Sequence, residues 1–156
     1  MNRRAFLTAI GSAALLPAFL RKVSAIAGFR RRRPPDIEWP SPSAWRQLNN
    51  AVDQNLLTVR SPLSSIKTDP GGSAAKRLFE NLKNPYYILD EPGLTQTLGW
   101  VDAWATQPSA YAVSARNARD IAQAVNFARD NDLRLVVKGG GHSYQGTSNA
   151  PDSLLI

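Results

Sequence analysis

Two segments in the first half of the chain place apolar residues at helical spacing. In residues 43–52 the apolar positions are 44, 45, 48, 51 and 52, and Ser43 is a suitable N-cap. In residues 73–82 they are 74, 75, 78, 79 and 82, and the pattern stops before Asn84-Pro85. Both segments therefore predict amphipathic helices.

The second half of the chain alternates short apolar runs with one longer helical pattern. Residues 110–114 and 133–137 predict strands, and the segment between them predicts a helix from an Asn117 N-cap to about Asn131. The apolar residues expected on one face of this helix are Ala118, Ile121, Ala122, Val125 and Ala128. A strand, helix and strand in this order predict a βαβ unit with two parallel neighbouring strands. The fold class is therefore α/β (α+β).

The apolar residues near the N-terminus are organised differently, as a targeting segment. Arg3-Arg4-Ala5-Phe6-Leu7 is close to the twin-arginine export pattern, and the apolar stretch from Ala5 to Leu20 is shorter than the roughly 20 residues that span a bilayer. Val23-Ser24-Ala25 suits a signal peptidase. We expect residues 1–25 to be a cleaved signal read by the twin-arginine export machinery, with no stable membrane anchor and a periplasmic or secreted product.

Composition divides the rest of the chain into three parts. Residues 26–43 are rich in Arg and Pro and predict an extended linker. Residues 44–105 predict a helical and aromatic N-terminal arm, in which the aromatic residues of 86–104 should pack the arm onto the main domain. Residues 106–156 predict the beginning of a domain that breaks off inside a strand at 153–156.

Charge and cysteine content exclude several function classes. The net charge is +7, but eight of the nineteen Lys and Arg residues lie in the first 33 positions, and the rest are nearly matched by twelve Asp and Glu. The folded part is thus almost neutral, and we expect no nucleic-acid partner. With no Cys and a single His, neither a disulfide framework nor a zinc site built on those residues is expected, and no metal is predicted.

The candidate site follows the second strand of the βαβ unit. There the chain reads Lys138, three glycines at 139–141, His142, Ser143, Tyr144, Gln145 and Gly146. Glycine visits positive φ freely and lets main-chain N–H groups approach a ligand, so the loop suits a phosphate at the carboxyl edge of the strands. Taken singly, a lone histidine or a glycine run is more often structural.

Two common phosphate motifs do not fit this loop. A Rossmann fingerprint beginning at Gly139 needs glycine at the sixth position, where Tyr144 stands. A P-loop built on Gly141 and Gly146 needs lysine where Thr147 stands.

The sequence from Lys138 to Gly146 resembles instead the loop R-S-G-G-H-S-Y-E-G of FAD-linked oxidases of the vanillyl-alcohol-oxidase type. These oxidases have a PCMH-type FAD-binding domain. Among them, the sequence is most similar to the berberine-bridge-enzyme-like group. The departures are Lys138 for arginine, Gly139 for serine and Gln145 for glutamate. The resemblance implies an incomplete PCMH-type domain from about residue 106, preceded by the signal and the arm. It further implies that the loop amides bind the FAD pyrophosphate and that His142 is joined covalently to the flavin 8α-methyl carbon. The cofactor-binding residues implied are Lys138, Gly139, Gly140, Gly141, His142, Ser143, Tyr144 and Gly146, and the resemblance assigns no catalytic residue.

The function that follows is that of an exported FAD-dependent oxidoreductase, present as an N-terminal fragment that is inactive alone. It would oxidise an alcohol, amine or sugar carbon of a small-molecule substrate by hydride transfer to the flavin. Two alternatives stay open: a truncated non-enzymatic product, and a nucleotide-phosphate-binding module without a redox role.

Overall fold

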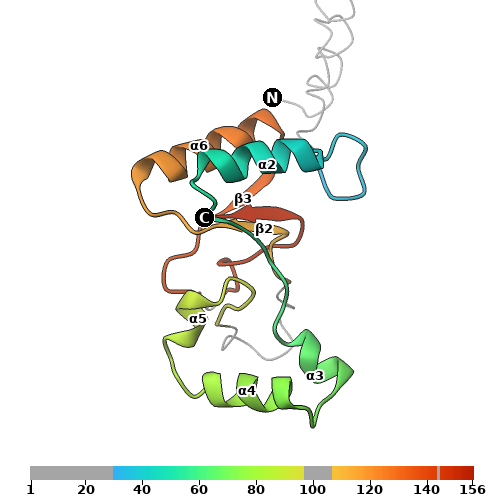
Figure 1. Cartoon of the computed structure of the whole chain (residues 1–156), viewed down its shortest axis with the longest axis vertical. Coiled ribbons are helices and arrows are strands. Elements are labelled where there is room, and N and C mark those ends of the chain that lie inside the picture. The colour runs from blue at the N-terminus through green and yellow to red at the C-terminus, as the bar shows by residue number, and fades with distance from the viewer. Residues whose placement is uncertain (1–29, 97–106, 144) are drawn as a thin grey trace, which may run out of the picture. The chain divides into compact units, whose positions relative to one another are not determined.

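The computed structural model describes residues 30–96, 107–143 and 145–156, and residues 31–156 form one compact unit (Figure 1). The predicted signal segment, Trp100, Trp104 and Tyr144 lie outside the described residues. Within the described ranges, no helix combines the length and the apolar character that crossing a bilayer requires.

A four-stranded mixed sheet with the strand order β1-β2-β4-β3 forms the centre of this unit. The strands are β1 Leu56–Thr58, β2 Tyr111–Val113, β3 Arg134–Val136 and β4 Ser153–Leu155. β1 is antiparallel to β2, whereas β2 and β3 both run parallel to β4. The α/β class is confirmed.

The expectation that β2 and β3 are neighbours is wrong, because β4 lies between them. Leu154 is opposite both Tyr111 and Leu135, and all three residues of β4 are buried, with Leu154 at 0% exposure. A strand with no solvent-facing side is most stable in the middle of a sheet, where neighbours cover both of its edges.

The crossover helix α6, Ala118–Asp130, connects β2 to β3 as predicted. The Asn117 side chain accepts a hydrogen bond from the Asp120 N–H at 3.0 Å, which confirms the predicted N-cap. Of the predicted apolar face, Ala128 is buried as predicted, but Ile121 is 46% and Val125 40% exposed. Asp120 and Ala124, which lie outside the predicted face, are buried instead. Small alanine side chains let α6 lie close to its neighbours, and periodicity alone does not choose between two adjacent apolar rows.

Helix α2, Pro42–Ala51, packs beside α6, and the two helices lie together on the sheet (Figure 1). Its N-cap is Ser41 rather than the expected Ser43, since the Ser41 Oγ accepts the Ala44 N–H at 3.2 Å. Pro42 then occupies the first turn, where its missing N–H costs nothing. Trp45 stacks on Tyr111 with ring centroids 3.9 Å apart, so the segment expected as an arm shares its core with the βαβ unit.

The described part of the predicted extended linker, residues 30–43, contains turns and the first residues of α2. The Arg33 N–H donates to the Asp36 carboxylate at 2.8 Å, and the Trp39 ring lies 5.6 Å from that of Trp45. Burying the apolar area of Trp39 against Trp45 stabilises these turns despite the proline content.

The other helices in the described part of the chain are α3 Ser64–Thr68, α4 Ser73–Asn81 and α5 Tyr87–Asp90, which Figure 1 places away from α2 and α6. The predicted helix at 73–82 is confirmed by α4, which buries Ala75 and Leu78. The Tyr86 ring, expected to pack, is 70% exposed. Contacts from this segment to the glycine loop are made instead by residues 88–96.

Candidate functional site

The glycine loop leaves the sheet at the carboxyl end of β3. The Lys138 N–H donates to the Ile156 carbonyl at 2.8 Å and fixes the start of the loop beside β4. Among the described residues of the loop, Gly141 (+74°) and Gly146 (+67°) have positive φ, so of the three consecutive glycines only Gly141 uses the conformational freedom expected of them.

Five consecutive backbone N–H groups of the loop, from Gly139 to Ser143, donate no hydrogen bond to the described part of the chain. Gly139 and Gly140 are exposed, and a Cβ added at Gly139 would meet no atom within 4 Å. Exposed amide donors beside open space are what an anionic group such as a pyrophosphate requires. The residues present therefore fit the phosphate part of a dinucleotide cofactor.

The segment after α5 holds the middle of this loop in place. The Gly141 carbonyl accepts hydrogen bonds from the Gln96 N–H at 2.8 Å and from the Thr95 hydroxyl at 3.0 Å. A Cβ at Gly141 would lie 2.9 Å from the Ile88 Cγ2 and 3.0 Å from the Lys138 Cε. Gly141 is therefore packed tightly, and its carbonyl cannot move without breaking two hydrogen bonds.

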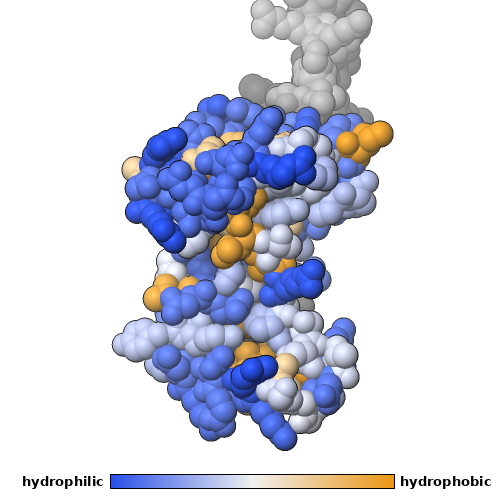
Figure 2. Space-filling view, in the orientation of Figure 1, coloured by the Kyte–Doolittle hydropathy of each residue, from blue (hydrophilic) through white to orange (hydrophobic). Residues whose placement is uncertain are grey.

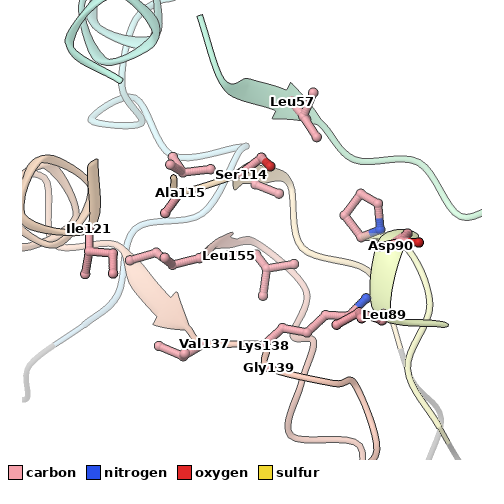
Figure 3. Close-up of a pocket in the computed structure, with 14 residues that line it drawn as sticks. Leu57, Leu89, Asp90, Ser114, Ala115, Ile121, Val137, Lys138, Gly139 and Leu155 are labelled. Atoms are coloured by element: carbon pink, nitrogen blue, oxygen red, sulfur yellow. The ribbon is translucent and has the colours of Figure 1, made fainter. Parts of the chain in front are cut away.

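Lys138 extends along the pocket towards α5 (Figure 3). Its ammonium group donates to the carbonyls of Glu91 at 2.6 Å and Leu94 at 3.0 Å. Burial lowers the pKa of Lys138 below its usual 10.5, an effect opposed by the carboxylates of Glu91 and Asp90. Two of the three N–H groups of this expected cofactor-binding residue thus serve to attach the loop to the Glu91–Leu94 turn.

A buried polar cluster around Asn149 holds the other end of the loop. The Asn149 side-chain oxygen accepts from the N–H and the hydroxyl of Ser109, both at 3.1 Å. Its amide nitrogen donates to the carbonyls of Pro92 at 3.0 Å and Leu94 at 3.3 Å. Asn149 is 5% exposed, and its bonds to Ser109 and to the Leu94 carbonyl are buried. The Leu94 carbonyl accepts from both Lys138 and Asn149 and so connects both ends of the loop.

His142 lies on the exposed side of the loop, and its Nδ1 is 2.6 Å from the Gln96 Oε1. A Cβ at Gly140 would lie 3.0 Å from the His142 Cδ2, so the ring passes over that glycine. Ser143 closes a small turn, in which its carbonyl accepts the Gly146 N–H at 3.1 Å and its Oγ accepts the Thr147 N–H at 3.1 Å. The structure thus brings together all the predicted site residues except Tyr144, which lies outside the described residues.

A pocket of about 580 Å³ adjoins the loop at the carboxyl ends of the parallel strands. Its lining is mainly apolar and includes Leu57, Ile121, Val137 and Leu155, together with Lys138 and Gly139 (Figure 3). Hydrophobic surface is visible on the face of the molecule below the α2 and α6 helices (Figure 2). Gly139 belongs to the glycine loop and also lines the pocket, whereas His142 does not line the pocket.

Several residues that support the site were missed by the sequence analysis, namely Thr95, Gln96, Ser109 and Asn149. Their partners lie 40 to 57 positions away along the chain. No local pattern marks them, because helix and strand periodicity reports contacts within a few positions.

No protein-family model matches the chain. Among curated proteins, the chain is 28% identical over 162 aligned positions to the FAD-linked oxidoreductase notD of Aspergillus sp. (strain MF297-2), which covers 90% of this chain. It is 32% identical over 146 positions, or 81% of its length, to the bifunctional decalin synthase calF of Penicillium decumbens. The chain spans about a quarter of these relatives, 26% and 25% respectively.

Two solved structures of flavoproteins are similar to this chain in fold. The crystal structure of the VAO-type flavoprotein MtVAO615 from Myceliophthora thermophila C1 is similar with a TM-score of 0.66 at 25% identity, covering 80% of this chain and 26% of the flavoprotein. MtVAO713 from the same organism has a TM-score of 0.67 at 20% identity, covering 81% of this chain and 25% of the flavoprotein. The mixed α/β arrangement described above is therefore shared with part of these flavoproteins.

Proposed function

We propose that this chain, which belongs to the vanillyl-alcohol-oxidase (VAO, PCMH-type) FAD-binding superfamily, supplies the pyrophosphate-binding loop of an FAD-dependent oxidoreductase. The observation that carries the proposal is the run of five N–H groups from Gly139 to Ser143 that donate to no described residue. These amides would hold the FAD pyrophosphate, and the Glu91–Gln96 segment would keep the loop in place. Lys138 and Asn149, which both bond to that segment, would fix the shape of the loop.

Bound FAD would supply the redox chemistry, accepting a hydride from an alcohol, amine or sugar carbon of a small-molecule substrate. Within this chain, His142 is the residue proposed to carry the covalent bond to the flavin 8α carbon, as in the berberine-bridge-enzyme-like group. Its imidazole is exposed beside the amide run, and no acidic side chain occurs between Lys138 and Asn149 to oppose an anionic cofactor.

The test uses the full-length protein that contains this chain. His142→Ala should abolish flavin fluorescence on a denaturing gel while some dissociable FAD remains in the native protein. Gln145→Ala is the matched control, since this exposed loop residue makes no hydrogen bond with the described chain and should keep the covalent flavin. Flavin that survives denaturation in the His142→Ala protein would refute the attachment site, and failure of the wild-type protein to retain FAD would refute the cofactor.

Export through the twin-arginine pathway to the periplasm or beyond is part of the same proposal. It is supported by Arg3-Arg4 with Phe6-Leu7 and by an apolar stretch too short to span a bilayer. That pathway transports folded, cofactor-loaded proteins, which suits a flavoprotein.

A further inference from the structure

A second pocket, of about 430 Å³, lies at the amino ends of β3 and β4. Among the described residues that line it are the arginines Arg31, Arg32, Arg33 and Arg134 and the acidic residue Asp152. We call it the arginine pocket. The glycine loop follows the carboxyl end of β3, so the arginine pocket lies at the opposite end of the same strands. It has no lining residue in common with the apolar pocket beside the glycine loop.

The fold holds the arginine run of residues 31–33 against the start of β3. The Arg32 N–H donates to the Asp132 carbonyl at 3.0 Å. The Arg32 guanidinium lies 3.2 Å from the Asp132 carboxylate and donates to the Glu38 carbonyl at 3.1 Å. Arg134 follows as the first residue of β3. Arg32 is therefore used in the fold, and it fixes the segment that brings Arg33 to the same pocket as Arg134.

The guanidinium groups of Arg33 and Arg134 are not used in this way. Both side chains are exposed, and neither makes a hydrogen bond or salt bridge with the described part of the chain. Within the described sheet β3 is an edge strand, where a charged side chain can serve only to prevent pairing with another sheet. Arg134 alone would be enough for that purpose. It does not explain why Arg33, from a distant segment of the chain, lines the same pocket.

The chemistry of this arrangement suits a phosphate group. A guanidinium presents its N–H donors in a planar fork that matches two oxygens of a phosphate. Two such forks in one hollow can bind a phosphate from two sides, and the charges of Arg31 and Arg32 add to the attraction. The Asp152 carboxylate opposes an anion, but four guanidinium groups line the pocket with it.

The size of the basic region indicates a single phosphate group rather than a nucleic-acid backbone. Beyond residue 33 the charges of the chain are nearly balanced, so the positive potential is confined to this hollow. The volume of about 430 Å³ lies within the range of about 300–1,000 Å³ that is typical of small-molecule sites.

We propose that the arginine pocket is a phosphate-binding site, separate from the FAD site, for a phosphate group carried by a soluble phosphorylated molecule or by a lipid headgroup. Arg33 and Arg134 bind the phosphate oxygens, and Arg32 is a positioning residue. The proposal does not depend on the proposed function, because none of these residues belongs to the glycine loop.

Inorganic phosphate is the probe for the chemistry that both sources share. It is titrated into the FAD-loaded full-length protein by calorimetry, so that FAD already occupies the glycine loop. The double variant Arg33→Gln/Arg134→Gln should weaken phosphate binding by about tenfold or more, since two charge-assisted hydrogen-bonding groups are lost. Arg33→Lys/Arg134→Lys keeps the charge but not the fork and should restore the affinity only in part.

The matched control is Arg46→Gln/Arg77→Gln. It removes the same charge from two exposed arginines that do not line the arginine pocket, and it should leave phosphate affinity close to that of the wild-type protein. Equal weakening in the two glutamine variants would overturn the proposal, because general charge and not the pocket would then attract phosphate. If the protein retained no FAD, phosphate bound at the glycine loop would persist in Arg33→Gln/Arg134→Gln, which distinguishes the two sites.

Vesicles of phosphatidylcholine and phosphatidylglycerol distinguish the two sources of phosphate. Cosedimentation that is lost in Arg33→Gln/Arg134→Gln but kept in Arg46→Gln/Arg77→Gln would support the site and assign its phosphate to a lipid headgroup. Saturable binding of inorganic phosphate without cosedimentation would support the site and assign it to a soluble molecule. A wild-type protein that binds neither inorganic phosphate nor these vesicles would overturn the proposal.

Discussion

Substituting alanine at two of the consecutive glycines should separate backbone conformation from steric space. Gly141 has φ +74°, and a Cβ there would lie 2.9 Å from the Ile88 Cγ2 and 3.2 Å from the Ile88 carbonyl oxygen. Alanine in the left-handed region costs about 1–2 kcal/mol, and overpacking typically adds about 1–3 kcal/mol. Gly141→Ala should therefore destabilise the folded loop by about 2–5 kcal/mol.

The matched control is Gly139→Ala. Gly139 has no positive φ, and its added Cβ would meet nothing within 4 Å. This substitution should be neutral, or stabilising by about 0.4–1 kcal/mol, because alanine restricts the unfolded chain. The two substitutions add the same methyl group to the same loop, but only Gly141→Ala should destabilise it.

Amide hydrogen exchange at Gln96 reports this difference directly, because its N–H donates to the Gly141 carbonyl. A loss of about 2 kcal/mol or more should accelerate exchange by at least about thirtyfold where exchange follows the opening equilibrium. Gly139→Ala should leave the Gln96 rate close to that of the wild-type protein. Equal exchange rates in the two variants would refute the reasoning from φ and packing.

Three further predictions concern the loop supports and export. Asn149→Ala should lower the free energy of unfolding, measured by urea titration, by about 2–4 kcal/mol, because the Ser109 N–H and the carbonyls of Pro92 and Leu94 lose their partner. A decrease of less than about 1 kcal/mol would contradict this role of Asn149. Burial lowers the pKa of Lys138 below 10.5, so the unfolded chain binds the Lys138 proton more tightly than the folded chain does. The stability of the wild-type protein relative to Lys138→Met should therefore rise with pH in the alkaline range up to 10.5. A fall in this relative stability would contradict the lowered pKa. Replacing Arg3 and Arg4 by lysine should hold the precursor in the cytoplasm while a general-secretion control is exported, and undiminished export would rule out the twin-arginine route.

Local features of the sequence were sufficient to predict the βαβ unit and the place of the loop. The Asn117 cap, the helix that became α6 and the strands beside it depend on hydrogen bonds and side-chain spacing within a few positions. The glycine run could likewise be placed at the carboxyl end of β3 from its neighbours in the chain alone.

Contacts between segments that are distant along the chain could be identified only from the tertiary structure. The order of the strands depends on where the fully buried β4 is most stable, and the buried row of α6 depends on how closely α2 and the sheet approach it. Gln96 and Asn149 reach partners 40 to 57 positions away, and their role follows from the folding of residues 91–96 against the loop. Periodicity and capping describe interactions within one helix or strand, whereas the free energy of packing depends on which elements contact one another. The sequence pattern therefore located the glycine loop but not the residues that hold it in place.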